Sequence, residues 1–155
     1  CDWSSDVCSS DLGVSMKAER LEEFRVRFND VVRERLTPED LQPLVTADAV
    51  VDLASLTPKF FRIIQQMEPF GPGNMRPVFL SRGLRHRYQP KMVGKGHVKM
   101  TLSDGNNSLS AIAFNFGDRL MDIGAAGSLS VAFALEENEW QGTTSLQMKV
   151  RGIAV

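Results

Sequence analysis

In the stretch His97-Val98-Lys99-Met100-Thr101-Leu102-Ser103, polar and apolar side chains alternate without a break. Successive side chains of a β-strand point to opposite faces, so this period of two predicts a strand with one buried and one solvated face. The next four residues, Asp104 to Asn107, are of the types that form tight turns. The stretch therefore predicts a strand and turn of an antiparallel β domain.

The same period recurs on both sides of this strand. We expect strands at Val78–Tyr88 (bent near Gly83), Val98–Ser103, Leu109–Phe116, Leu129–Leu135 and Leu146–Val150, with a short helix at Gly117–Ile123. Five strands with a helix between the third and fourth follow the order of an OB-fold, a partly open Greek-key barrel. An SH3-like barrel is the competing fold, but it does not call for a helix at that place.

The first half of the chain has a different organisation. Apolar residues at helical spacing predict an amphipathic helix over Lys17–Leu36 and a second helix over Pro58–Met67, with a short strand at Val45–Leu53 between them. Two helices and one strand without a matching sheet are typical of the remnant of a truncated α/β domain. The fold class is therefore α+β, a truncated α/β remnant followed by a five-stranded OB-fold barrel.

Residues 1–12 have no helical or strand period, and we interpret them as a disordered artefact translated from a sequencing adapter. Both cysteines lie there, so the remaining chain has no disulfide or cysteine-based metal site. We expect residues 13–68 to be the remnant, 69–76 a Pro/Gly linker and 77–155 the OB-fold. A chain that begins natively near Gly13 is expected to be an interior piece of a longer protein.

Charge is sorted along the chain. Nine basic and 13 acidic residues precede Pro77, whereas nine basic and six acidic residues follow it. Seven Arg and Lys residues lie between Arg76 and Lys99, and no acid occurs from Pro69 to Ser103. A strip of one sign on a small β domain is typical of a surface that contacts phosphate groups.

The expected ligand face of an OB-fold spans strands two and three, between the loops that join strands one to two and four to five. Here those loops are Pro90–Gly96 and Glu136–Gly142. Cations could follow phosphates while an aromatic ring stacks on a base. The candidate DNA-binding residues are Arg82, Arg85, Arg87, Lys91, Lys95, His97, Lys99 and Trp140. The alternative is a solvated barrel surface with a Trp that only packs a loop.

No catalytic constellation is evident. His86 and His97 are the only histidines, and Glu136, Glu137 and Glu139 in one predicted turn have no His or Asp partner nearby. We predict neither a catalytic nor a metal-binding residue in this chain. No apolar run approaches the roughly 20 residues that span a bilayer, so no membrane partner is expected.

Several motifs resemble the RecJ single-stranded-DNA exonucleases. The most specific is Glu68-Pro69-Phe70-Gly71-Pro72-Gly73-Asn74 followed by Pro77-Val78-Phe79. Others are Leu36–Leu41, Leu56–Pro58, Gly94–Leu102, Ala111–Phe114, Glu136–Gly142 and Leu146–Val150. Together they cover nearly all of residues 13–153.

The resemblance implies a DHH phosphoesterase core, a DHH-associated domain and an OB-fold, in a bacterial cytoplasmic enzyme of recombination and repair. That enzyme degrades single-stranded DNA from the 5′ end with Mn²⁺ or Mg²⁺. This chain lacks the Asp-His-His motif, so no catalytic residue is carried over and no cofactor is expected in it. We expect the end of the DHH-associated domain and an OB-fold that guides single-stranded DNA to the missing core. Helicase and single-strand-binding protein are partners by resemblance.

Two other functions stay open. The chain could be a stand-alone OB-fold that binds single-stranded nucleic acid, or a protein-interaction OB-fold whose basic face docks an acidic segment.

Overall fold

The computed structural model describes residues 14–37, 40, 44–140 and 142–155. The segment interpreted as an artefact, residues 1–12, lies outside these ranges. The chain divides into two compact units, one up to Leu44 and one from Val45 to Val155. Each unit is described by itself.

The first unit contains one helix. A single 3-10 turn (η1, Ala18–Arg20) leads into α1 (Leu21–Arg35), as the sequence pattern predicts. Phe24 and Phe28 are four residues apart, and their rings stack with centroids 5.6 Å apart. No residue of α1 is buried, so the apolar stripe of this helix has no packed partner among the described residues.

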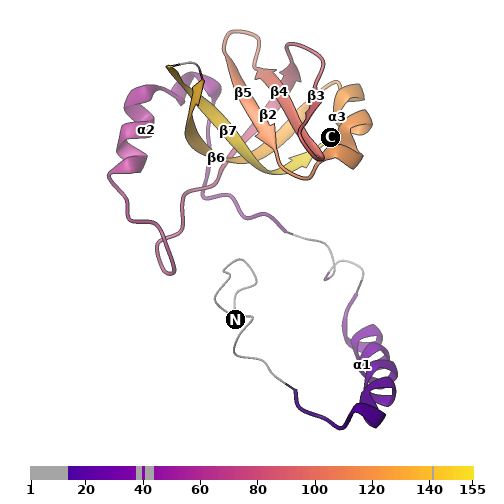
Figure 1. Ribbon diagram of the computed structural model, residues 1–155. Helices are drawn as coiled ribbons and strands as arrows, with labels where there is room; N and C mark the ends of the chain where they lie inside the picture. Colours follow the sequence, from indigo (N-terminus) through magenta and orange to yellow (C-terminus); the bar gives the residue numbers. More distant parts are fainter. Residues whose placement is uncertain (1–13, 38–39, 41–43, 141) are drawn as a thin grey trace. The chain divides into compact units, whose positions relative to one another are not determined.

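The second unit is built on an OB-fold barrel (Figure 1). Its five principal strands are β2 (Phe79–His86), β4 (His97–Ser103), β5 (Ser108–Ala113), β6 (Leu129–Trp140) and β7 (Thr143–Ala154). They pair in the order β2-β6-β7-β5-β4, and a β2–β4 pairing closes the barrel. The β5–β7 pair is parallel and the others are antiparallel. The predicted fold class is confirmed.

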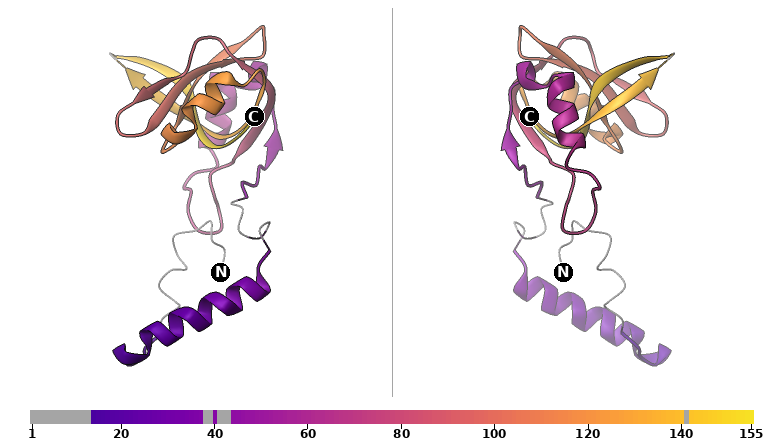
Figure 2. Two further views of the ribbon diagram at one scale, coloured as in Figure 1. Left: turned by 90° about the vertical axis from the view of Figure 1, so that its right-hand side faces the viewer. Right: turned by 90° about the vertical axis from the view of Figure 1, so that its left-hand side faces the viewer.

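The core lies inside the barrel and at its two ends. Inward side chains of β4 and β6, such as Val98, Leu102 and Phe133, are fully buried. The helices α2 (Pro58–Gln65) and α3 (Leu120–Ala125) lie at opposite ends of the barrel (Figures 1 and 2). Each buries apolar side chains there, including Phe61 of α2 and Ile123 of α3. Barrel and helices therefore share one core.

Residues 45–68 were expected to belong to a separate remnant domain, but in the structure they belong to the same compact unit as the barrel. The expected strand Val45–Leu53 is reduced to β1 (Ala49–Val50), which pairs in parallel with β2 and leads into a 3-10 turn (η2, Leu53–Ser55). Leu53, Leu56 and Ile64 are buried in the barrel core. The reason is hydrophobic burial: the apolar stripe of α2 covers a barrel end that would otherwise be exposed to water.

Two expected loops are partly strands. Within Pro90–Gly96, β3 (Lys91–Val93) pairs with the start of β4. The expected loop Glu136–Gly142 is instead the tip of a long hairpin, because β6 and β7 stay paired as far as Trp140 and Thr143. Backbone pairing between two long strands continues past the barrel wall, so polar residues there do not end the strands.

The expected bend in β2 is confirmed. The pairing of β2 with β6 shifts register between Ser81 and Leu84, and Gly83 has a φ of 70°. That positive φ favours glycine, and the resulting bulge lets both Ser81 and Leu84 point inward.

Hydrogen bonds hold the Pro/Gly linker, residues 69–76, in a defined loop. Gly71 and Asn74 exchange backbone hydrogen bonds, and the Asn74 side chain donates to the carbonyls of Met67 (2.8 Å) and Pro69 (2.9 Å). The Arg76 guanidinium lies 4.8 Å from the centroid of the Phe70 ring. These contacts give the loop a fixed form between α2 and β2.

Candidate nucleic-acid interface

A row of residues crosses the outer face of the barrel over four strands. Lys91 of β3 pairs with Lys99 of β4, Lys99 pairs with Ile112 of β5, and Ile112 pairs with Lys149 of β7. Directly paired residues point to the same face of a sheet, and neighbouring strands are about 4.8 Å apart. Three lysines and one isoleucine therefore form a continuous row, which we call the lysine row.

One of the three lysines of this row, Lys149, was not among the candidates named from the sequence. Lys149 lies 50 residues after Lys99, and only the parallel β5–β7 pairing brings the two onto one face. The alternation of Gln147, Lys149 and Arg151 with the inward Met148 and Val150 shows an outward strand face, but not which strands are its neighbours.

A second row of paired residues, next to the lysine row, is polar and uncharged. Thr101 of β4 pairs with Ser110 of β5, which pairs with Gln147 of β7. The Gln147 side chain is 5% exposed and donates from Nε2 to the Ser110 hydroxyl at 3.1 Å. This second row therefore adds hydrogen-bonding groups to the face but no charge.

Two of the three candidate arginines border the same face. Arg85 pairs with Ser103 of β4, and the Arg87 guanidinium reaches the Ser108 hydroxyl of β5 at 3.0 Å. Both are exposed, as the strand parity predicts. Arg82 lies on the bulged part of β2 that pairs with β6, so the structure does not bring it to the lysine row.

Lys95 lies at the tip of the β3–β4 hairpin. Gly94 and Gly96 flank it with φ values of 57° and 82°, which non-glycine residues rarely adopt. The carbonyl of Gly96 accepts a hydrogen bond from Gly117 at 3.0 Å. The exposed lysine is thus carried on a turn that is fastened to the barrel on one side.

His97 contacts an aromatic residue that the sequence did not single out. Its ring centroid is 4.9 Å from that of Phe114 in an edge arrangement, and its Nδ1 accepts from the Asn115 N–H at 3.2 Å. The Lys149 ammonium lies 5.5 Å from the Phe114 ring centroid. Because Ala111 and Ala113 point inward, the parity of β5 could have identified Ile112 and Phe114 as outward residues.

Trp140, the expected stacking residue, ends β6 and pairs through its backbone with Thr143. Its side chain lies outside the described part of the structure, so its role stays a prediction.

The cations of this face differ in whether they form ion pairs with acidic residues. Within the described ranges, no ion pair involves Arg82, Arg85, Arg87, Lys91, Lys95 or Lys99. Lys149 differs, because its ammonium lies 3.5 Å from a carboxylate oxygen of Glu136 on β6. On this face the positive surface therefore meets one acidic side chain of β6, Glu136; Glu137 and Glu139 are exposed but have the opposite parity along the strand.

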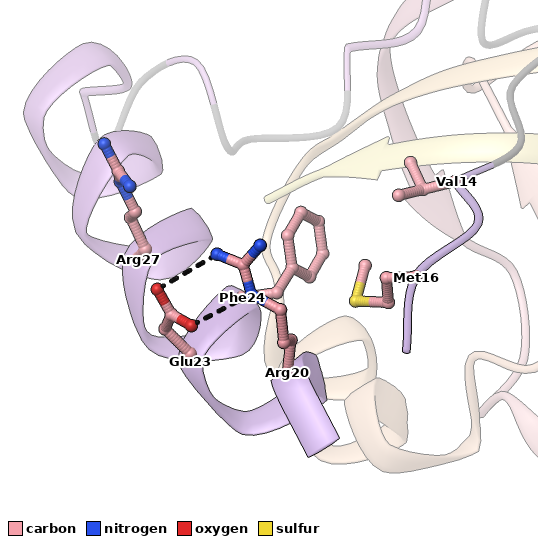
Figure 3. A pocket seen from close by; sticks show the side chains of 6 residues that line it. All are labelled: Val14, Met16, Arg20, Glu23, Phe24 and Arg27. Carbon is pink, nitrogen blue, oxygen red and sulfur yellow. Dashed lines mark hydrogen bonds and ion pairs between the residues drawn. The ribbon is translucent and has the colours of Figure 1, made fainter. Parts of the chain in front are cut away.

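The remaining chemically notable groups have structural surroundings. His86 points inward, where its Nε2 lies 2.8 Å from the carbonyl of Ile123 in α3. A hollow of about 260 Å³ on the first unit has Arg20, Glu23 and Phe24 among the six residues that line it, and Arg20 and Glu23 are paired to each other (Figure 3).

The described residues contain no group of three or more His, Cys, Asp or Glu side chains placed to hold a metal ion. None of the helices in the described ranges is long and apolar enough to cross a membrane.

Topology and surface together define a class: an OB-fold domain whose customary ligand face carries several cations, most of which form no ion pair within the described residues. The family model described as the RecJ OB domain matches residues 47–152, and the chain belongs to this family. This confirms the resemblance found in the sequence motifs.

Curated relatives agree with this assignment. The chain is 27% identical to the single-stranded-DNA-specific exonuclease RecJ of Bacillus subtilis over 144 residues, which are 92% of this chain and 18% of the relative. It is 29% identical to the Escherichia coli RecJ over 143 residues, 91% of this chain and 24% of the relative. The chain thus spans about a fifth to a quarter of the length of these relatives.

The fold matches a solved relative. The crystal structure of Thermus thermophilus RecJ in complex with Mn²⁺ superposes with a TM-score of 0.70 at 23% identity, covering 92% of this chain and 20% of that one. The same protein in complex with Mg²⁺ gives a TM-score of 0.68.

Proposed function

We propose that this chain is a C-terminal, non-catalytic part of a single-stranded-DNA-specific 5′–3′ exonuclease, and that its lysine row binds single-stranded DNA. The observation that carries the proposal is the cross-strand register of Lys91, Lys99 and Lys149 on the customary OB ligand face. Lys95, Arg85 and Arg87 extend the same face at its two borders.

The physical basis of binding is electrostatic. Each phosphate that is neutralised by a lysine or arginine releases condensed counterions, which gives a log–log salt slope of roughly −0.7 per phosphate on single strands. Cations that form no internal ion pair can contact phosphate without first breaking a protein contact. Binding by such a face is expected to be weak, salt-sensitive and nearly independent of sequence.

In the parent protein, this face would hold the strand and direct its 5′ end to a metal-dependent core elsewhere. The two Thermus thermophilus RecJ structures contain Mn²⁺ or Mg²⁺, and we assign no residue of this chain to that metal. The compact unit begins at Val45 and the family match at residue 47, so we propose that the parent's domain boundary lies there. The bacterial cytoplasm, DNA repair and recombination, and a helicase or single-strand-binding partner belong to the same proposal.

A fluorescence-anisotropy titration tests the binding. A labelled 15-residue oligo-dT should bind the chain with an affinity that falls linearly in log–log form as NaCl rises. A duplex of equal length and an acidic peptide of equal charge serve as competitors. Stronger competition by the acidic peptide than by unlabelled oligo-dT would contradict the proposal and favour the protein-interaction function.

A nuclease assay tests the non-catalytic assignment. Because the sequence has no Asp-His-His motif, the purified chain should release no nucleotides from 5′-labelled single-stranded DNA with Mn²⁺ or Mg²⁺. Nucleotide release that copurifies with the chain through successive columns would contradict it.

A further inference from the structure

We propose that Phe114, flanked by His97 and Lys149, is a base-stacking subsite for an unpaired nucleobase. The inference rests on the proposed function, since it assigns one element of the bound strand to one place on the basic face. It differs from the sequence expectation, which gave the stacking role to Trp140 alone.

The Phe114 ring lies on the outer face of the barrel, next to the lysine row. Phe114 directly follows β5, on the outward parity that it shares with Ile112, and the residue is 40% exposed. Ile112 pairs with Lys99 on one side and with Lys149 on the other. An apolar strip one strand wide thus lies between cations on both neighbouring strands.

This arrangement matches the chemistry of a nucleotide. A nucleobase has an apolar face that stacks on aromatic rings, and it is joined to phosphates that need cations close by. A purely apolar ligand would leave Lys99 and Lys149 without a role, and a simple anion would not use Ile112 and Phe114. Single-stranded DNA can use both parts of the surface, because its bases can stack on the apolar strip while its phosphates contact the lysines.

The Phe114 ring is also held in place by its neighbours. His97 packs edge-on against Phe114 with an interplanar angle of 64°, and the His97 ring is itself fixed by the hydrogen bond from the Asn115 N–H. Asn115 has a φ of 61°, an uncommon conformation for a non-glycine residue, which the His97 contact helps to hold. A ring fixed before binding loses less entropy when a base stacks on it.

The same hydrogen bond determines which ring nitrogen of His97 can donate to a ligand. With Nδ1 accepting from Asn115, neutral His97 carries its proton on Nε2. That N–H can donate to a base carbonyl or a phosphate oxygen next to the stacked base. His97 therefore has a positioning role toward Phe114 and a donor of its own.

The test compares two probes on the whole chain: labelled 15-residue oligo-dT and a 15-unit abasic deoxyribose-phosphate strand. Both carry the same phosphates, but only one has bases. Phe114→Leu keeps an apolar side chain at the end of β5 and removes the aromatic face. Phe28→Leu, the same change at a 56% exposed ring on α1, is the matched control.

Phe114→Leu should weaken oligo-dT binding roughly five- to hundredfold, the range for loss of one stacked base, with the salt slope unchanged. Binding of the abasic strand should stay the same, and Phe28→Leu should match the wild type on both probes. Equal oligo-dT affinity for Phe114→Leu and wild type, or an equal loss on both probes, would overturn the subsite and leave the lysine row intact.

Failure of the two proposals is distinguishable. If the wild type binds neither probe in a salt-dependent way, the proposed function fails and the subsite with it. A photo-crosslink between 5-iododeoxyuridine in the oligonucleotide and the wild-type chain gives a second measurement that needs no variant. The crosslinked peptide should contain Phe114, and a crosslink confined to peptides outside β4, β5 and β7 would contradict the proposal.

Discussion

The two faces of β4 have opposite constraints although they belong to one strand of seven residues. Val98, Met100 and Leu102 point inward and are at most 3% exposed. Lys99 points outward, is exposed and forms no ion pair among the described residues. The inward face must be apolar for the barrel to fold, whereas the outward face is free to carry charge. One alternating stretch therefore specifies both the fold and the proposed binding surface.

The largest expected effect lies on the inward face. Leu102→Ala removes a fully buried side chain from the barrel core and should lower the free energy of unfolding by about 2–5 kcal/mol, through lost transfer energy and a residual cavity. Lys99→Ala on the same strand should change stability by no more than about 0.5 kcal/mol. Urea denaturation of both variants measures the contrast, and similar losses for the two would show that the faces are not separate.

Trp140→Ala should have the next largest effect, and on binding alone. If its indole stacks on a base, the variant loses roughly 1–3 kcal/mol of affinity for oligo-dT with the salt slope nearly intact. Titration at several NaCl concentrations measures both quantities. An unchanged affinity would leave Trp140 a residue of the hairpin tip with no part in binding.

Glu136→Gln should have a smaller effect with the opposite sign. The Glu136 carboxylate competes with phosphate for Lys149, and both side chains are partly exposed, so the pair is worth at most about 1 kcal/mol. The variant should bind oligo-dT up to a few times more tightly, with a salt slope steeper by up to about 0.7. Glu137→Gln removes the same charge without a Lys149 contact, so an equal gain there would indicate only a general charge effect.

The smallest expected effect is on the turn between β4 and β5. Hydrogen bonds from the backbone N–H groups of Asn107 and Asn106 hold the pKa of Asp104 below its ordinary value of 3.8. The stabilisation is thus fully present above that value and is lost as the pH falls through the lower folded pKa. Asp104→Ala should melt slightly below the wild type at pH 7, and the difference should vanish in strong acid. A difference that persists there would show that the carboxylate charge is not responsible.

Patterns within short stretches of sequence predicted individual strands and which of their side chains point outward. The alternation at Val98–Ser103 identified β4, and the outward positions of Arg85 and Lys99 followed from strand parity. The β3 strand and the long β6–β7 hairpin were missed because backbone pairing continues through polar residues. Periodicity identifies the faces of a strand but does not show how far a partner strand extends it.

The sequence also did not predict which residues from distant segments become neighbours in the fold. Lys149 and Phe114 come together only through the parallel β5–β7 pair, which joins segments far apart in the sequence. The helices show the same limit, since α1 and α2 have similar apolar spacing. Phe61 of α2 is buried against the barrel, whereas no residue of α1 is buried. The sequence predicts an apolar face but not what covers it.

The salt dependence of DNA binding by a variant with both Lys95→Ala and Lys99→Ala shows whether the outward face of β4 contacts phosphate. Both side chains are exposed and outside the core, so the variant should fold as the wild type does. If they neutralise phosphates, the log–log salt slope on oligo-dT should flatten by about one to one and a half units, and affinity at low salt should fall. An unchanged slope with equal affinity would contradict the account, because the outward face of β4 would then be only a solvated surface.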